Sequence, residues 1–159
     1  MHFESELQRQ AVERVREYLE DLFEDVYEDP EDGHFYVSYG TTVLEISVEP
    51  YGPEDTTVAV TSYCVQGVEA EEPLLRGLLE LNHSLPVGAF SLVESDIFFT
   101  YALFGSTLER RSLLGAIAAV ANVADDYDDR IVAKYGGQTA LQRIRDTGGR
   151  ARRKKRAES

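Results

Sequence analysis

The sequence predicts an α+β domain with an antiparallel five-stranded sheet and three helices, in the order α-β-β-β-α-β-β-α. Apolar residues recur at steps of three and four in three segments, which is typical of helices that pack on a core. Between these segments lie five short stretches rich in β-branched and aromatic residues, bounded by Gly, Pro or Asp. Because the links between consecutive stretches are short, the strands are expected to pair antiparallel.

Residues 5–27 form the first predicted helix. Its apolar positions make one stripe, and acidic residues fill the opposite face. Ser5 and Gln8 have the spacing of a capping box, in which each side chain bonds the other residue's backbone amide. Pro30 and Gly33 lie in the acidic segment 28–33, so the helix is expected to break there.

Three strands are expected next, over residues 35–39, 42–49 and 57–65. In the second of them, apolar residues alternate with more polar ones, which is the period of a half-buried strand. Gly40 ends the first strand, and the Pro- and Gly-rich segment 50–55 separates the second from the third. These three strands therefore predict a meander.

A second helix follows the acidic residues and proline of segment 71–73, and it is expected to end before Pro86. Its leucines cover most of its circumference, so it must be buried on more than one side, by the sheet and by a second subunit. Residues 88–94 and 97–104 are predicted to form a hairpin, and its second strand is apolar on both faces. The first and last helices can cover one face of such a sheet. The other face needs a partner chain or a bound peptide.

The third predicted helix starts at a second capping box, Ser106 to Glu109, and ends at Gly136 and Gly137. Small residues on this helix let another element approach closely. We expect the folded domain to span residues 1–137 and residues 138–159 to form a separate tail.

Charge is distributed unevenly along the chain. The 159 residues include 16 Lys or Arg and 29 Asp or Glu, a formal net charge of −13. Residues 143–159 hold eight basic and two acidic residues, a net charge of +6, which leaves −19 for residues 1–142. Because the tail has few apolar residues to bury, we expect it to be disordered. Its densest basic run consists of Arg150, Arg152, Arg153, Lys154, Lys155 and Arg156.

This basic tail has several possible roles. It could serve as an electrostatic arm for nucleic acid, for an acidic partner or for the chain's own acidic body, or it could simply add solubility. The acidic body itself argues against direct contact with DNA or an anionic membrane, because like charges repel over the Debye length.

Motifs of catalysis and cofactor binding are absent from the sequence. None of the three His residues has a second ligand at metal-binding spacing, and no phosphate-binding glycine loop or nucleophile elbow occurs. The single cysteine, Cys64, lies in a strand pattern and is interpreted as a small core residue. We therefore expect no enzyme activity, no catalytic residue, no cofactor and no bound metal.

One acidic cluster leaves a choice of interpretations. Asp125, Asp128 and Asp129 share one face of the third helix. They could form a solvated face partly neutralised by Arg130 and Lys134, or a docking site for basic residues. A cation site with carboxylate ligands is the enzymatic alternative.

No stretch of the chain predicts a membrane segment. The longest nearly apolar run, residues 113–124, is far shorter than the roughly 18 residues that span a bilayer. The N-terminus is acidic and lacks an apolar signal core. These features favour a cytoplasmic protein.

A leucine-rich helix ending in Leu81-Asn82, a small-residue turn at Gly88, two strands and a long helix together resemble the YbjN family, which is similar in fold to type III secretion chaperones. The resemblance covers roughly residues 5–135 and rests on the segment Leu74 to Phe90. It implies a non-enzymatic homodimer that holds an extended client segment, and a link to regulation or stress responses.

From this resemblance we expect two surfaces. A peptide-binding groove on the first helix and the final hairpin would use Val15, Leu19, Leu22, Phe90, Leu92, Phe99 and Tyr101. A two-fold dimer interface on the second helix would use Leu75, Leu78, Leu79 and Asn82. The alternative is a regulatory protein whose basic tail contacts nucleic acid or a nucleoprotein complex.

Overall fold

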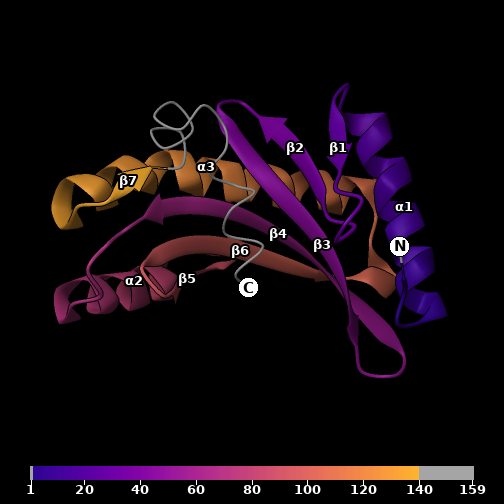
Figure 1. Cartoon of the computed structure of the whole chain (residues 1–159), viewed down its shortest axis with the longest axis horizontal. Coiled ribbons are helices and arrows are strands. Elements are labelled where there is room, and N and C mark those ends of the chain that lie inside the picture. The colour runs from indigo at the N-terminus through magenta and orange to yellow at the C-terminus, as the bar shows by residue number, and fades with distance from the viewer. Residues whose placement is uncertain (1, 140–159) are drawn as a thin grey trace.

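The computed structural model describes residues 2–139, and it confirms the α+β class with three helices and an antiparallel sheet (Figure 1). Its elements, in chain order, are α1 (Glu6–Leu22), β1 (Val26–Glu28), β2 (Phe35–Tyr39), β3 (Thr42–Tyr51), β4 (Asp55–Gln66), α2 (Glu72–Ser84), β5 (Ala89–Val93), β6 (Asp96–Phe104), a 3₁₀ turn (Gly105–Thr107), α3 (Arg110–Tyr135) and β7 (Gln138–Thr139).

Within residues 2–139, the sheet has seven strands rather than the predicted five. Its strand order is β1-β2-β3-β4-β6-β5, and β7 pairs separately with the end of β4. The five predicted strands are all present. The two additional strands, of three and two residues, are too short to show an alternating pattern in the sequence. Strand β7 lies within residues 138–159, the segment expected to form the tail.

The first helix begins where predicted and ends earlier, but only half of the expected capping box forms, because the Gln8 Oε1 atom accepts the Glu4 amide rather than the Ser5 amide. The Ser5 side chain accepts a hydrogen bond from the Gln8 amide at 3.0 Å, but the helix stops at Leu22. Strand β1, at residues 26–28, includes the last two residues of the predicted helix and pairs with β2 instead. The Arg16 guanidinium holds Glu28 of this strand through hydrogen bonds of 2.7 and 3.0 Å. Pairing with the sheet thus overrides the helical periodicity at this end.

The predicted start of the third helix is wrong. Ser106 does not cap it, because the backbone amide and hydroxyl of Ser106 donate to the Asp55 carboxylate at 3.0 and 2.7 Å. Residues 105–107 form the 3₁₀ turn, and α3 begins at Arg110. Its capping box is made by Glu109 and Ser112.

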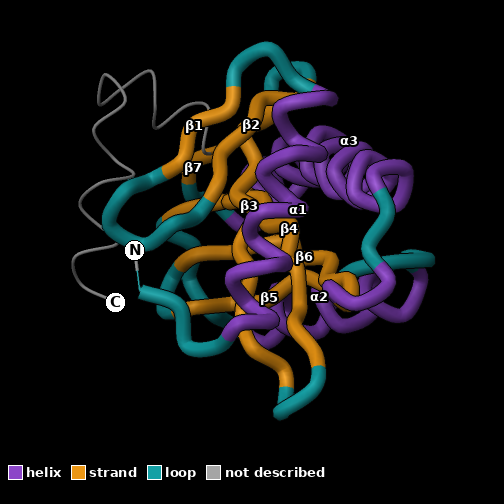
Figure 2. Tube along the Cα trace, turned by 90° about the vertical axis from the view of Figure 1, so that its right-hand side faces the viewer, coloured by secondary structure: helices purple, strands orange, loops and turns teal. Residues whose placement is uncertain are grey.

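All three helices pack on one face of the sheet. Helix α3 contacts β2, β3, β4 and β6, α1 contacts β3 and β4, and α2 contacts β5. Figure 2 shows the helices gathered towards one side of the strands. Strand residues that point to this side form the core, among them Leu44, Val60 and Phe99, which are fully buried. The opposite face of the sheet has no helix over it in the part of the chain that the structure describes.

Candidate peptide-binding groove and dimer face

Helix α2 is fixed to the sheet by its inner residues and leaves its outer face free. Leu74 and Leu78 are buried in the core, whereas Leu75 is 38% and Leu79 is 69% exposed. The Asn82 side chain bonds the main chain of Phe90 in β5. Of the four residues predicted for a dimer interface, only Leu75 and Leu79 are therefore on the outer face. Leu78 and Asn82 point inward, because the helix needs one side to pack on β5.

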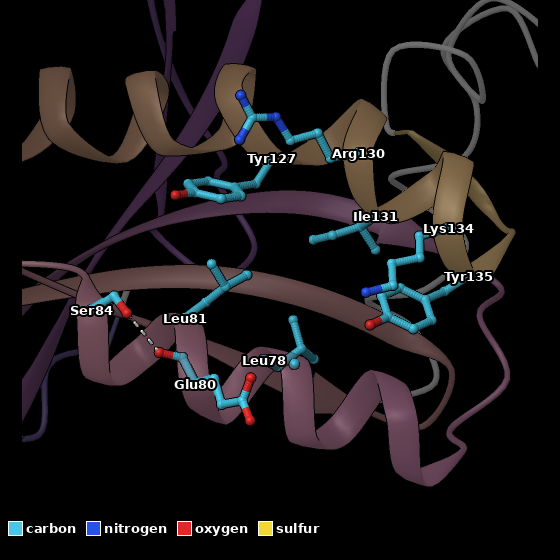
Figure 3. A pocket seen from close by; sticks show the side chains of 10 residues that line it. Leu78, Glu80, Leu81, Ser84, Tyr127, Arg130, Ile131, Lys134 and Tyr135 are labelled. Carbon is cyan, nitrogen blue, oxygen red and sulfur yellow. Dashed lines mark hydrogen bonds between the residues drawn. The ribbon is translucent and has the colours of Figure 1, made fainter.

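An apolar groove runs between α2 and α3. Leu78 and Leu81 rise from α2 towards Tyr127, Ile131 and Tyr135 of α3 (Figure 3). The space between the helices is about 370 Å³ and is open to the surface. It is large enough to accept one or two apolar side chains of a bound segment.

The groove is closed at the end nearest the start of α2. The Tyr135 hydroxyl donates a hydrogen bond of 3.2 Å to the carbonyl of Pro73. Gly77 makes this approach possible, because a Cβ at that position would lie 2.9 Å from the same hydroxyl oxygen. A side chain at position 77 would therefore displace the Tyr135 hydroxyl.

Basic and acidic residues border the groove on opposite walls. On α3, the Arg130 guanidinium stacks over the Tyr127 ring at 5.4 Å and the Lys134 amine over the Tyr135 ring at 5.3 Å. On α2, Glu80 lies at the rim, and its carbonyl accepts the Ser84 hydroxyl at 3.0 Å. An extended peptide with apolar side chains and a polar backbone matches such a lining.

The structure corrects the expected client-binding residues. Val15, Leu19 and Phe99 are fully buried and Phe90 is 5% exposed, so these four form the core of a single chain. Burial against the sheet leaves them no surface for a client. Leu22, Leu92 and Tyr101 are only half-buried.

Phe90 nevertheless lies beneath the groove. Its ring centroid is 6.0 Å from that of Tyr127 and 4.9 Å from that of Phe99. The groove itself has no signature in the sequence, because its lining comes from two helices nearly 50 residues apart and neither carries a distinguishing motif.

The acidic cluster of α3 does not form one solvated face. Thr42 donates a hydrogen bond of 2.8 Å to Asp125, which fastens α3 to the start of β3. Asp128 turns inward, and its Oδ1 atom is buried without a hydrogen bond. The pKa of Asp128 is raised to about 7, mainly by burial. A hydrogen bond from the Cys64 thiol lowers this pKa, and the carboxylates of Asp125 and Asp129 raise it. Arg130 and Lys134 pack on tyrosines, as described above.

No described group of three or more His, Cys, Asp or Glu side chains is arranged to hold a metal ion. Cys64 is fully buried, and burial raises the pKa of its thiol well above the usual range. It is the core residue that the sequence predicted. Among residues 2–139, no helix is long and apolar enough to cross a membrane. The six basic residues predicted for the tail lie outside the described residues.

Comparison with known proteins identifies the fold and the family. A family model described as "T3SS (YopN, CesT) and YbjN peptide-binding chaperone 1" matches residues 9–143. No curated protein matches the chain.

Solved structures with this fold are distant in sequence. The ExsC–ExsE complex is 12% identical, with a TM-score of 0.59, and the match covers 79% of this chain and 96% of that one. The Yersinia pestis type III secretion chaperone SycH, solved with a fragment of YscM2, is 15% identical, with a TM-score of 0.55 and coverages of 73% and 98%. YbjN from E. coli is 11% identical, with a TM-score of 0.54 and coverages of 75% and 92%.

Proposed function

We propose that this chain, which belongs to the T3SS and YbjN peptide-binding chaperone family, is a non-enzymatic homodimer that holds an extended client segment in the cytoplasm. The observation that carries the proposal is the apolar groove between α2 and α3. In this proposal the groove receives apolar side chains of the client, and the outer face of α2 joins two copies of the chain.

The groove supports client binding because it is apolar, open and already formed. Leu81, Tyr127 and Tyr135 are partly exposed to solvent there, so covering them with a client's apolar side chains removes apolar surface from water. Arg130 and Lys134 on one wall and Glu80 on the other can bond the polar groups of the same segment.

The outer face of α2 supports the dimer. Leu75 and Leu79 are exposed one helical turn apart, and Arg76 and Glu72, 2.8 Å apart, lie beside them. Two such faces related by a two-fold axis would bury both leucines of each copy and keep the charged pairs at the rim. The alternative function is that of a regulatory protein whose basic tail contacts nucleic acid or a nucleoprotein complex.

Site-specific photo-crosslinking tests client binding. A photoreactive amino acid at Ser84, on the rim of the groove, is expected to crosslink a client in a cell extract. The same amino acid at Glu17, on the exposed side of α1, serves as the control. Filling the groove with Ser84→Trp should then reduce binding of the identified client segment, measured with a labelled peptide. Equal crosslinking from both positions would contradict the proposal.

A further inference from the structure

The uncovered face of the sheet, which we call the open face, has a distinctive composition. It is formed by every second residue of β2, β3, β4 and β6, with cross-strand pairs such as Thr61–Thr100 and Ala59–Ala102 at its centre. The hydroxyls of Thr61 and Thr100 are 3.1 Å apart. Its floor is thus made of small side chains.

Three aromatic pairs border this floor. The ring centroids of Tyr27 and Tyr36 are 6.0 Å apart, those of Tyr63 and Phe98 are 4.5 Å apart, and those of Tyr51 and Phe104 are 5.4 Å apart. Strand pairing and alternation assign all six rings to the open face, together with Glu45 and Glu49. Tyr27, Tyr51 and Phe104 are at least half exposed. Aromatic faces that remain accessible to solvent are favourable sites for guanidinium and ammonium groups.

The open face is also acidic. No strand that the structure describes contains Lys or Arg, whereas Glu45 and Glu49 both lie on the open side of β3. The Tyr36 hydroxyl donates to Glu45 at 2.9 Å, and the His34 Nδ1 atom lies 2.9 Å from the same carboxylate. This charge favours a basic ligand over an anionic one.

The chain leaves the described structure at the edge of the same sheet. Strand β7 pairs Thr139 with Val65 and Gln138 with Gln66, so the direction of the chain continues along β4 towards the start of β3. There the Thr42 hydroxyl donates a hydrogen bond to Asp125 of α3. Helix α3 contacts β7 and β3 on the helical side of the sheet, whereas no described helix lies over the open face at this point.

The length and charge of the remaining segment fit this surface. Residues 140–159 number 20 and carry eight basic and two acidic residues. Fully extended, they span about 65 Å, whereas β1 and β5 lie only about 15 and 10 Å from β4. The segment can therefore cross the whole face in either direction.

We infer that residues 140–159 dock on the open face of their own chain, with Arg and Lys side chains against the aromatic pairs and the carboxylates of Glu45 and Glu49. The docked segment shields this face from other chains. The inference goes beyond the proposed function, because it concerns the opposite side of the sheet from the groove and does not require a client.

Disulfide capture in the full chain tests this inference. Ser47→Cys on the open face is combined with Ala151→Cys in the tail, and the natural Cys64 stays silent because it is fully buried. The control combines Ala151→Cys with Asn122→Cys on the exposed side of α3. Intramolecular crosslinking, read from intact mass and gel mobility, should be at least roughly tenfold faster for the Ser47 pair. About 1 M salt should remove most of that advantage.

Other occupants give different outcomes. Equal rates for the two pairs would overturn the inference, and so would a crosslink that joins two chains. Suppression of the crosslink by low concentrations of duplex DNA, without suppression by a neutral polymer, would assign the tail to nucleic acid instead. As a second readout, Glu45→Gln with Glu49→Gln should slow capture several-fold, whereas Glu17→Gln with Glu20→Gln on α1 should not. Equal effects of the two charge variants would also overturn it.

Discussion

Asn82 of α2 bonds both main-chain groups of Phe90 in the edge strand β5. The Phe90 amide donates to the Asn82 Oδ1 atom at 2.6 Å, and the Asn82 amide donates to the Phe90 carbonyl at 3.1 Å. An edge strand otherwise presents unpaired main-chain groups to other chains. This residue therefore fastens α2 to the sheet and blocks strand addition at that point.

Asn82→Ala is expected to lower the free energy of unfolding by about 1–3 kcal/mol, because it leaves both Phe90 groups partly buried and unpaired. Urea denaturation would measure this loss. His83→Ala, at the exposed neighbouring position, should change the stability by less than about 0.5 kcal/mol. Equal losses of unfolding free energy in Asn82→Ala and His83→Ala would show that the hydrogen bonds between Asn82 and Phe90 do not stabilise the fold.

Leu79→Glu is expected to dissociate the proposed dimer without unfolding the chain, because Leu79 is already 69% exposed in one copy. Light scattering at roughly 100 μM protein would give the mass of each variant. Leu114→Glu, on an exposed part of α3, is the matched control and should leave the mass unchanged. A monomeric wild type, or a dimer that survives Leu79→Glu, would contradict the assignment of the interface.

Asp128 makes the stability dependent on pH. Burial raises its pKa to about 7 in the folded chain, against an ordinary value of 3.8. Between these values the folded state binds more protons than the unfolded state, so stability decreases as pH rises through that range. The carboxyl destabilises the fold most above pH 7. Below pH 3.8 it is protonated in both states and has no effect.

Asp128→Asn should remove this dependence. Between about pH 5 and about pH 8.5, the free energy of unfolding of the wild type should fall by about 3 kcal/mol more than that of the variant. Urea denaturation at a series of pH values measures both. Asp126→Asn, at an exposed position of the same helix, should follow the wild type. Parallel curves for wild type and Asp128→Asn would disprove the assignment.

Gly137 lets the end of the described chain reach β4. Its φ of +87° is in the left-handed region, and a Cβ there would lie 2.6 Å from the Gln66 carbonyl oxygen. Gly137→Ala should destabilise the fold by more than about 1 kcal/mol and weaken the pairing of β7. Hydrogen exchange at β7 and denaturation would detect the two effects.

Gly115→Ala serves as the control for Gly137→Ala, because it is expected to change the stability in the opposite direction. Gly115 is exposed within α3, and a Cβ there would meet nothing within 4 Å. The substitution should therefore stabilise the chain by about 0.5–1 kcal/mol. Destabilisation by Gly115→Ala together with a neutral Gly137→Ala would contradict this account of the two glycines.

The sequence alone predicted the helices and the long strands well. The Ser5 cap, Pro73 in the first turn of α2, and the two glycines after α3 act through contacts with near neighbours in the chain, so local residues decide them. The burial of Cys64 and the alternating burial along β3 were also predictable, because they follow from the hydrophobicity of the side chains and from the two-residue period of a strand.

The candidate sites were harder to predict, because apolar residues in the core and at a binding surface have the same composition. Val15 and Leu19 resembled groove residues in the sequence and are core residues in the structure. Tyr127 and Ile131 carried no signal of a groove until α3 was placed beside α2.

By itself, the sequence determined the α+β class, the order of the main elements, the acidic body and its basic tail, since composition and short-range periodicity fix these. Only the tertiary structure decided that Asp128 turns inward, that Leu78 packs on the sheet while Leu79 faces solvent, and that all three helices of residues 2–139 lie on one face of the sheet. Those outcomes depend on which segments far apart in the chain pack together, and no local pattern specifies that pairing.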